Sequence, residues 1–162
     1  MRSSRRATPK RTRVRKQGNA TLEELERNKW GEPEYRSHVV TECHRLRRVQ
    51  LRLLTVENLR LLIGQNIGLT FLIPIALERL REDPLVEGDF FPGDLLSAVL
   101  RSNRSYWAEN AKEREAVVAI IERARSAAAS QGKIVKRALE ESITAFAEQC
   151  RACSTLKCNT RA

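Results

Sequence analysis

The sequence predicts an all-α fold: a compact domain of about six helices that follows a basic N-terminal tail. Three observations lead to this prediction. Apolar residues recur at steps of three and four along most of the chain, which is the period of an amphipathic helix. Thr21 and Thr55 stand where N-cap residues are expected, at the start of two such segments. No segment alternates apolar and polar residues as a half-buried strand would.

The 162 residues suit one domain, and 41% of them are hydrophobic, which is enough to form a core. The net charge of +10 is spread unevenly along the chain. Residues 1–20 hold eight basic residues and no acidic one, whereas residues 21–131 hold 16 basic and 17 acidic residues. We therefore predict a disordered basic tail over 1–20, a single helical domain over 21–150, and a frayed C-terminal tail over 151–162.

The first helix is predicted from a capping pattern at its start, and the second from the spacing of its apolar residues. Thr21 and Glu24 match the capping-box pattern, so we expect a helix from Leu22 to about Lys29, with Gly31 as its stop. The next segment, 35–48, shows apolar residues at helical spacing. These residues are Val39, Val40, Cys43 and Leu46.

Two buried helices are predicted in the middle of the chain. One begins after Thr55 and ends at Gly64 or Gly68. The other covers 69–81 and is apolar almost all round, which is typical of a central helix. Pro74 lacks a main-chain N–H group, so we expect a kink or a late helix start there.

The C-terminal half predicts three more helical segments, over 95–100, from about 106 to 127, and over 134–150. The middle segment is long and amphipathic, and its apolar residues are expected to face the core. These residues are Val117, Val118, Ile120 and Ile121.

A membrane location is not predicted. The longest uncharged run, 61–77, contains polar residues and is shorter than the roughly 20 apolar residues that a membrane-spanning helix needs. Ser4, Arg5 and Arg6 resemble part of a twin-arginine signal, but no apolar stretch follows them. We therefore expect a cytoplasmic protein.

No catalytic residue, cofactor or metal is predicted. Cys43 and His44 are neighbours in sequence, but adjacent residues on a helix point in different directions, so we interpret them as a buried thiol and a surface imidazole. A small hydrolase built on this pair stays a remote alternative. Cys150, Cys153 and Cys158 begin with a spacing that suits zinc, but they offer no fourth ligand, so we expect reduced thiols.

The most unusual local feature is an acidic loop. Three carboxylates lie within eight residues, interleaved with two phenylalanines: Glu87, Asp89, Phe90, Phe91 and Asp94. Such a cluster could serve acid–base catalysis, bind a cation or contact a basic partner. The alternative is a solvated loop whose phenylalanines pack into the core and whose Asp94 caps the next helix.

The basic tail suggests nucleic acid. Eight positive charges can neutralise phosphates and give weak, salt-sensitive contact without sequence preference. The tail has no aromatic residue for base stacking, and residues 57–81 fail as a helix-turn-helix because the second segment begins with apolar residues. Met1 is the only methionine, and a non-ATG start near Val14 would remove most of the tail, so we hypothesise that residues 1–20 are non-native or dispensable.

Residues 21–100 resemble the immunity proteins of bacterial contact-dependent growth inhibition (CDI) systems. The order and spacing of several short strings produce this resemblance over about eighty residues. The strings are Leu22-Glu23-Glu24-Leu25-Glu26, Trp30-Gly31-Glu32-Pro33, Cys43-His44-Arg45-Leu46-Arg47, Leu54-Thr55-Val56-Glu57-Asn58-Leu59-Arg60, Ile63-Gly64-Gln65-Asn66-Ile67-Gly68-Leu69, Pro74-Ile75-Ala76-Leu77-Glu78 and the run from Glu87 to Leu96.

The resemblance implies a small cytoplasmic helical protein that is not an enzyme. Such a protein binds the toxin domain delivered by a neighbouring cell and blocks it. The basic tail and the cysteine-rich end have no counterpart in the resemblance, and a small basic nucleic-acid-associated helical protein remains the alternative. If the toxin is basic, we expect three acidic contact residues and two aromatic anchors. These residues are Glu87, Asp89, Asp94, Tyr106 and Trp107.

Overall fold

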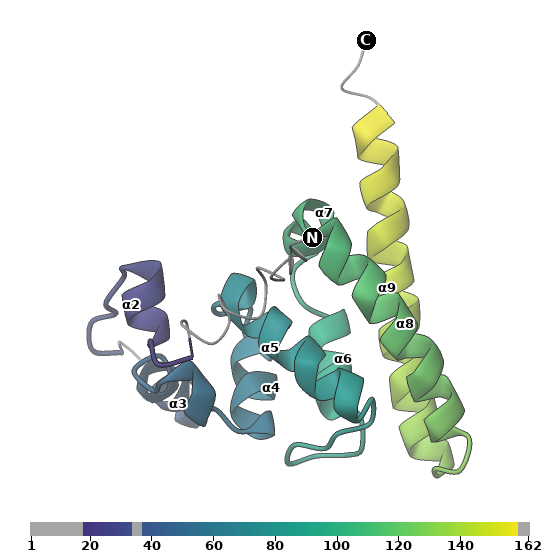
Figure 1. Ribbon diagram of the computed structural model, residues 1–162, viewed down its shortest axis with the longest axis horizontal. Coiled ribbons are helices and arrows are strands. Elements are labelled where there is room, and N and C mark those ends of the chain that lie inside the picture. Colours follow the sequence, from purple (N-terminus) through teal and green to yellow (C-terminus); the bar gives the residue numbers. More distant parts are fainter. Residues whose placement is uncertain (1–17, 34–36, 159–162) are drawn as a thin grey trace, which may run out of the picture. The chain divides into compact units, whose positions relative to one another are not determined.

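The computed structural model describes residues 18–33 and 37–158, with side chains described as far as Arg151 (Figure 1). Across these residues the fold is all-α, with eight α-helices, one 3-10 helix and no β-strand, which confirms the predicted class. The chain divides into two compact units, Met1–Leu54 and Thr55–Ala162, and each is described by itself. A single domain over 21–150 stays a prediction.

The first unit begins with a short helix, α2, over Leu22–Glu26. The predicted capping box is present: the Thr21 hydroxyl accepts from the Glu24 N–H at 3.2 Å, and the Glu24 carboxylate accepts from the Thr21 N–H at 2.8 Å. The helix ends earlier than the predicted stop at Gly31. Arg27 takes the left-handed conformation with φ of 52° and closes the helix, because the exposed residues that follow add no buried apolar contact.

The second helix, α3, covers His38–Leu46 and begins at the N-cap Ser37, later than the sequence predicted. Its C-terminal apolar residues, Cys43 and Leu46, are buried as expected. Val39 belongs to the same apolar stripe, but 39% of it is exposed. Only the C-terminal half of the predicted stripe therefore packs inward.

Arg47, directly after α3, is the buried polar centre of this unit. It is 1% exposed, and its guanidinium donates to the Glu26 carboxylate and to the Asn28 carbonyl, the latter at 2.9 Å. The Cζ atom lies 4.0 Å from the centroid of the Trp30 ring. Arg47 thus joins the end of α3 to the chain that follows α2, a tertiary role that helical spacing does not reveal.

The last residues of the predicted tail belong to the first unit. The N–H groups of Leu51 and Arg52, in the 3-10 helix η1 (Leu51–Leu53), donate to the carbonyls of Ala20 and Gly18 at 3.0 and 2.9 Å. Disorder was expected as far as residue 20, so this expectation is wrong for residues 18–20. The remainder of the predicted disordered tail lies outside the described residues.

The second unit begins with α4 (Val56–Gly64) and α5 (Leu69–Glu82), close to their predicted bounds. Thr55 caps α4 as expected and forms a capping box with the third residue of the helix. Gly68, with φ of 63°, precedes α5, which begins at its predicted start and continues through Pro74. The late start considered for Pro74 is therefore not found.

The predicted long helix over 106–127 is two helices, α7 (Arg104–Glu109) and α8 (Ala111–Ala128). The break lies at Asn110, whose φ and ψ of −112° and 66° are not helical. Its side-chain amide donates to the Tyr106 carbonyl at 2.7 Å. An asparagine side chain that bonds the main chain competes with the helix, which accounts for the break.

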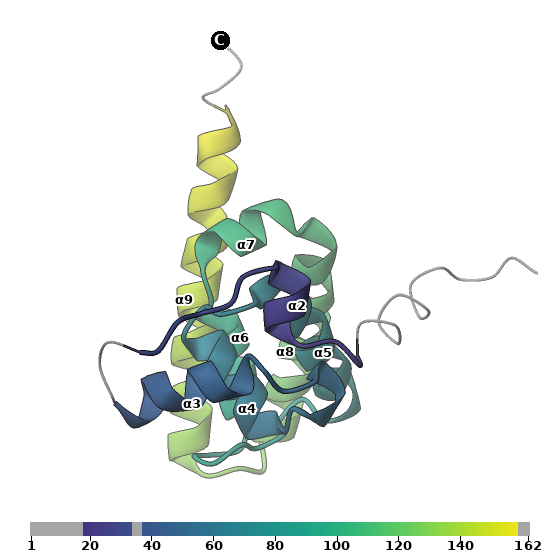
Figure 2. The same ribbon diagram turned by 90° about the vertical axis from the view of Figure 1, so that its left-hand side faces the viewer.

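Helix α6 (Asp94–Leu100) packs against α4, α5 and α9 (Lys133–Cys158), while α8 packs against α5 and α9 (Figure 2). Most of the inward residues predicted for α8 are buried, but 49% of Val118 is exposed, so that prediction is wrong for Val118. Helix α9 continues past its predicted end at residue 150 to Cys158, because no Gly or Pro interrupts the sequence there.

Candidate functional site

The segment between α5 and α6 is a closed loop, residues 83–93. Its base is fixed where the Gly93 N–H donates to the Leu85 carbonyl at 3.0 Å, and a single antiparallel bridge pairs Glu87 with Pro92. Gly93 has a φ of 88°, a conformation that residues with a side chain rarely adopt. The loop therefore has a defined path before any side chain is considered.

Asp94, the first residue of α6, holds this loop from inside. It is 3% exposed, and its two carboxylate oxygens accept from the main-chain N–H groups of Gly88 and Phe90 at 2.7 and 3.1 Å. One interpretation of the sequence made Asp94 the cap of α6, but Gly93 occupies the N-cap position and Asp94 caps the loop instead. The negative charge still lies in the first turn of the helix, where the macrodipole stabilises it.

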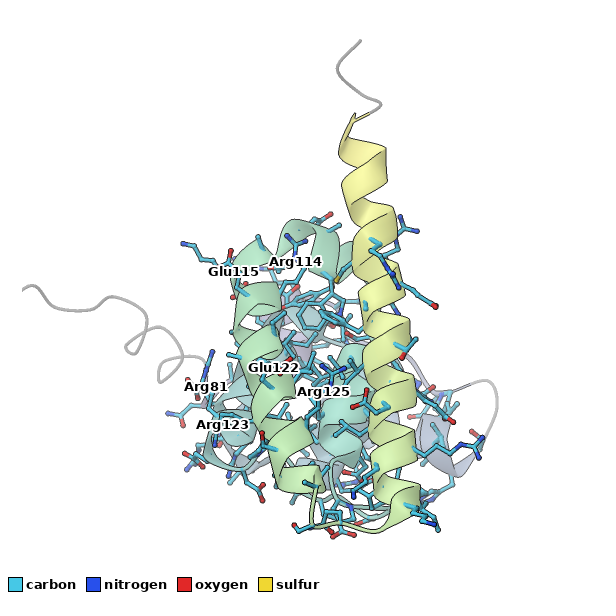
Figure 3. All side chains as sticks on the ribbon, turned by 90° about the vertical axis from the view of Figure 1, so that its right-hand side faces the viewer. Arg81, Arg114, Glu115, Glu122, Arg123 and Arg125 are labelled. Carbon is cyan, nitrogen blue, oxygen red and sulfur yellow. The ribbon has the colours of Figure 1, made fainter. Side chains whose placement is uncertain are left out.

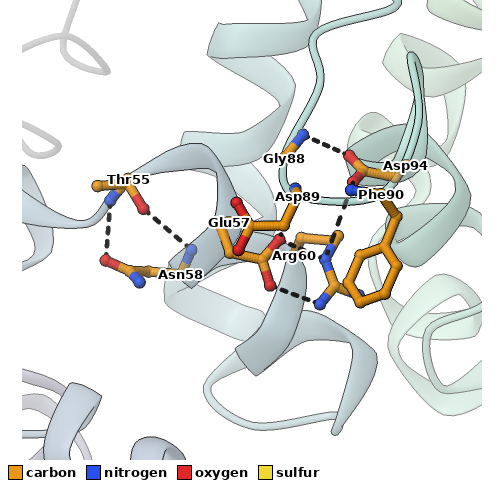
Figure 4. A network of polar contacts seen from close by, with 8 residues as sticks. All are labelled: Thr55, Glu57, Asn58, Arg60, Gly88, Asp89, Phe90 and Asp94. Atoms are coloured by element: carbon orange, nitrogen blue, oxygen red, sulfur yellow. Dashed lines mark hydrogen bonds and ion pairs between the residues drawn. The ribbon is translucent and has the colours of Figure 1, made fainter.

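Glu57 and Arg60, on α4, hold the other side of the loop (Figure 4). The Arg60 guanidinium donates twice to the Glu57 carboxylate, at 2.6 Å each, and its Nε lies 4.0 Å from the Asp94 carboxylate. The Asp89 N–H donates to Glu57 at 3.1 Å. Hydrogen bonding from Arg60 lowers the pKa of the Glu57 carboxyl, and burial opposes this shift. Glu57 is therefore held in its charged form.

Gly88 is required by space at the point where the carboxylates of Glu57 and Asp94 converge. A Cβ atom at this position would lie 2.6 Å from a Glu57 oxygen and 3.0 and 3.2 Å from the two Asp94 oxygens. These carboxylates are held by Arg60 and by main-chain N–H groups, so they are not free to move aside. Glycine lets the main chain pass between them.

The loop phenylalanines do not both pack into the core as one interpretation predicted. Phe91 is half-buried, but 67% of Phe90 is exposed. The Arg60 Cζ lies 4.4 Å from the centroid of the Phe90 ring. The exposed ring therefore rests on a guanidinium that is itself fixed by Glu57.

The structure brings together only some of the predicted contact residues. Glu87 and Asp89 lie in the loop and are exposed at its surface, and Asp94 follows directly after the loop. Asp94 is buried, because its oxygens serve the loop main chain. Its carboxylate therefore holds the loop from inside and is not exposed at the surface.

Tyr106 and Trp107, expected as aromatic anchors, are instead core residues of α7, 8% and 1% exposed. The Trp107 ring packs edge-on against Tyr106 and Phe146, with centroid distances of 5.2 Å in both cases. Its Nε1 donates to the Ser102 hydroxyl at 3.0 Å, so its polar atom is satisfied inside. Burial also raises the pKa of the Tyr106 hydroxyl.

The Cys43 and His44 pair has the wrong environment for a nucleophile. Burial, and then the nearby Glu42 charge, raise the pKa of the Cys43 thiol, so at neutral pH it is protonated. A catalytic cysteine needs the opposite shift. The His44 ring packs edge-on against Trp30 with a centroid distance of 5.0 Å.

The described residues contain no group of three His, Cys, Asp or Glu side chains arranged to hold a metal ion. Of the three C-terminal cysteines, Cys150 has a described side chain, while the side chains of Cys153 and Cys158 lie outside the described part. Within that same part of the chain, no helix combines the length and the apolar character needed to cross a membrane.

The arginines of α8 bond to carboxylates or to main-chain carbonyls (Figure 3). Arg125 donates to Glu140 and to Glu122, at distances between 2.9 and 3.2 Å. Arg123 donates to the Arg81 carbonyl at 2.6 Å. The charges of this face are interleaved, which does not resemble the continuous basic strip typical of a nucleic-acid interface.

Sequence reasoning missed Glu57, Arg60 and Gly88. Glu57 and Arg60 are three residues apart on a helix, and this spacing signals a local ion pair. Nothing in that spacing indicates a loop 32 residues further along the chain. Gly88 lies inside the acidic loop, but its proximity to two carboxylates depends on the tertiary fold.

A family model of CDI immunity proteins matches residues 24–117, which is more than half of the chain. The matched stretch contains α4, the loop over 83–93 and Asp94. No curated protein and no solved structure matches the chain. The family match confirms the resemblance predicted from the sequence: the chain belongs to the family of CDI immunity proteins.

Proposed function

We propose that this protein binds the toxin domain of its own CDI system and neutralises it. Family membership supports the immunity role. Neutralisation by covering a toxin surface requires a rigid interface and no catalytic group. On this proposal the protein acts in the cytoplasm as a binding module and needs no cofactor.

The observation that supports this proposal most is the preorganised loop over 83–93. Its main-chain N–H groups at residues 88, 89 and 90 donate to fixed carboxylates of Asp94 and Glu57. A loop already fixed in the free protein loses little conformational entropy when a partner binds. More of the contact energy then remains as affinity.

The charge of the loop favours a basic partner. Glu87, Asp89, Glu57 and Asp94 supply four carboxylates, and Arg60 supplies the guanidinium that faces Glu57 and Asp94. We therefore propose Glu87 and Asp89 as toxin contacts, with Asp94 beneath them as support. The buried Tyr106 and Trp107 belong to the scaffold in this proposal. An acidic surface speeds association with a basic partner, and salt reduces that effect.

Calorimetry and stopped-flow mixing with the toxin domain encoded beside this gene test the proposal. We expect one-to-one binding that abolishes toxin activity. The double variant Glu87→Gln/Asp89→Asn should lower the association rate by about tenfold at low salt, with a weaker salt dependence. Glu141→Gln, on the exposed surface of α9, is the matched control and should bind like wild type.

Two results would count against this proposal. Absence of wild-type binding at concentrations of about 100 μM would reject the neutralising role. Wild-type binding with an unchanged rate for the double variant would remove Glu87 and Asp89 from the interface.

The alternative function, nucleic-acid binding, depends on the basic tail. Deleting the tail therefore distinguishes it from toxin binding. Residues 18–20 bond to η1, so the deletion should end at residue 17. We expect toxin binding to survive and any nucleic-acid affinity to disappear. Loss of toxin binding on this deletion would place part of the interface in the tail.

A further inference from the structure

Phe90 is the one large aromatic side chain among the described residues that folding leaves mostly in water, with 67% of it exposed. Phe146, by contrast, is 4% exposed and lies in the core beside Trp107. Aromatic side chains contribute large apolar areas to cores and interfaces. An exposed phenylalanine therefore leaves much of its apolar surface without a partner in this chain.

The Phe90 ring is held in place even though it is exposed. Its own N–H donates to the buried Asp94 carboxylate at 3.1 Å, which fixes the main chain beneath it. One face of the ring meets the Arg60 guanidinium at 4.4 Å, and Glu57 fixes that guanidinium through two hydrogen bonds (Figure 4). A ring fixed at its base and on one side presents the rest of its surface in a defined direction.

We infer that Phe90 is the apolar anchor of the toxin-binding surface, and that it inserts into an apolar pocket on the toxin with a basic rim. This inference rests on the proposed function and adds a residue whose burial contributes strongly to the affinity. The basic rim follows from charge, because the exposed carboxylates of Glu87 and Asp89 belong to the same loop as Phe90. Beneath the loop, the carboxylates of Glu57 and Asp94 lie against a single guanidinium, that of Arg60. Interface hot spots are buried side chains of this kind, surrounded by polar residues that exclude water.

The test is a comparison of Phe90→Ala with Ile134→Ala. Ile134, at the start of α9, is 82% exposed and lies outside the loop. Ile134→Ala therefore also removes exposed apolar surface, as Phe90→Ala does, but at a site away from the proposed interface. With the toxin domain as the probe, we expect Phe90→Ala to weaken the affinity by about 30-fold or more. Ile134→Ala should stay within about twofold of wild type. Phe90→Leu, which keeps an apolar side chain, should fall between wild type and Phe90→Ala.

The possible failures are distinguishable. If wild type does not bind the toxin, the proposed function fails and the anchor fails with it. If wild type binds and Phe90→Ala binds equally well, only the anchor is overturned. An equal loss of affinity in Ile134→Ala would also overturn it. Sedimentation tests a second copy of the chain as the occupant: a wild-type dimer that Phe90→Ala converts to a monomer would overturn the toxin pocket.

Urea unfolding of each variant is the necessary control. Most of the Phe90 ring is already in water, so Phe90→Ala should unfold at nearly the same urea concentration as wild type. A weaker affinity in a variant of unchanged stability is then a contact effect. A large fall in the unfolding midpoint would show that the ring serves the fold, and would overturn its assignment as an anchor.

Discussion

Replacing Asp94 with asparagine keeps the shape of the side chain and removes one of its two acceptor oxygens. In the wild type, both oxygens accept from main-chain N–H groups, those of Gly88 and Phe90. An asparagine can accept only one of these bonds, and its NH2 group then faces the other N–H. Two donors then meet in a site that is almost closed to water, since Asp94 is 3% exposed.

The expected loss of stability follows from two contributions. A hydrogen bond to a charged group contributes about 1.5–3 kcal/mol to stability, and this contribution is lost when one N–H group no longer has an acceptor. Removing a negative charge from the first turn of α6 costs about 0.5 kcal/mol more. The free energy of unfolding should therefore fall by about 2–3.5 kcal/mol. For a chain of this size, that corresponds to a fall in melting temperature of roughly 4–14 °C.

Urea unfolding followed by circular dichroism measures this loss, with Asp89→Asn as the control. The Asp89 side chain is exposed, and its contact with Glu57 is made by the main chain, so this variant should change stability by less than about 0.5 kcal/mol. If Asp94→Asn and Asp89→Asn unfold at the same urea concentration, the carboxylate of Asp94 does not hold the loop. The explanation given for its burial would then be refuted.

Three further outcomes are expected. Hydrogen bonding from Arg60 lowers the pKa of Glu57 in the folded protein below its ordinary value of 4.5. The ionised carboxylate therefore stabilises the folded state above pH 4.5, and this stabilisation is lost as the pH falls through the lowered pKa of the folded state. When urea unfolding is measured from about pH 3 to about pH 7, the free energy of unfolding should fall less steeply with decreasing pH in Glu57→Gln than in wild type. The same pH dependence in both proteins would contradict this expectation. Burial raises the pKa of the Cys43 thiol, so iodoacetamide at neutral pH should modify it at least about tenfold more slowly in native than in urea-unfolded protein, as followed by mass spectrometry. Trp107→Ala should lower the free energy of unfolding by about 3–5 kcal/mol, measured by calorimetry, because it empties a core site and removes the hydrogen bond that the ring donates to the Ser102 hydroxyl. A loss under about 1 kcal/mol would place the ring outside the core.

The local parts of the fold could be predicted because both partners of each signal lie within a few residues. The predicted capping box at Thr21 and the predicted N-cap at Thr55 each join residues three apart, and both are present. The bounds of α5 followed from its apolar pattern in the same way. The break at Asn110 was missed because an asparagine is tolerated inside helices, and its bond to the Tyr106 carbonyl decides the matter only after folding.

The candidate site was predicted only in part. The acidic loop is visible in the sequence, but exposure and burial within it depend on residues elsewhere. Asp94 is buried because two N–H groups of the folded loop reach it, and Glu57 lies on another helix. Trp107 was expected at the surface because aromatic residues are common in interfaces, yet Phe146, from a distant helix, covers it.

The manner in which the loop is held has a consequence for how such a protein evolves. Its shape depends on main-chain N–H groups of residues 88, 89 and 90, and every residue except proline supplies such a group at positions 89 and 90. If positions 87, 89 and 90 contact the toxin as proposed, mutations there can alter which toxin is recognised while the loop keeps its path. Gly88 has no such freedom, because any side chain there would meet two carboxylates. On the proposed function, the scaffold can thus be inherited unchanged while a few surface substitutions in the loop follow changes in the toxin.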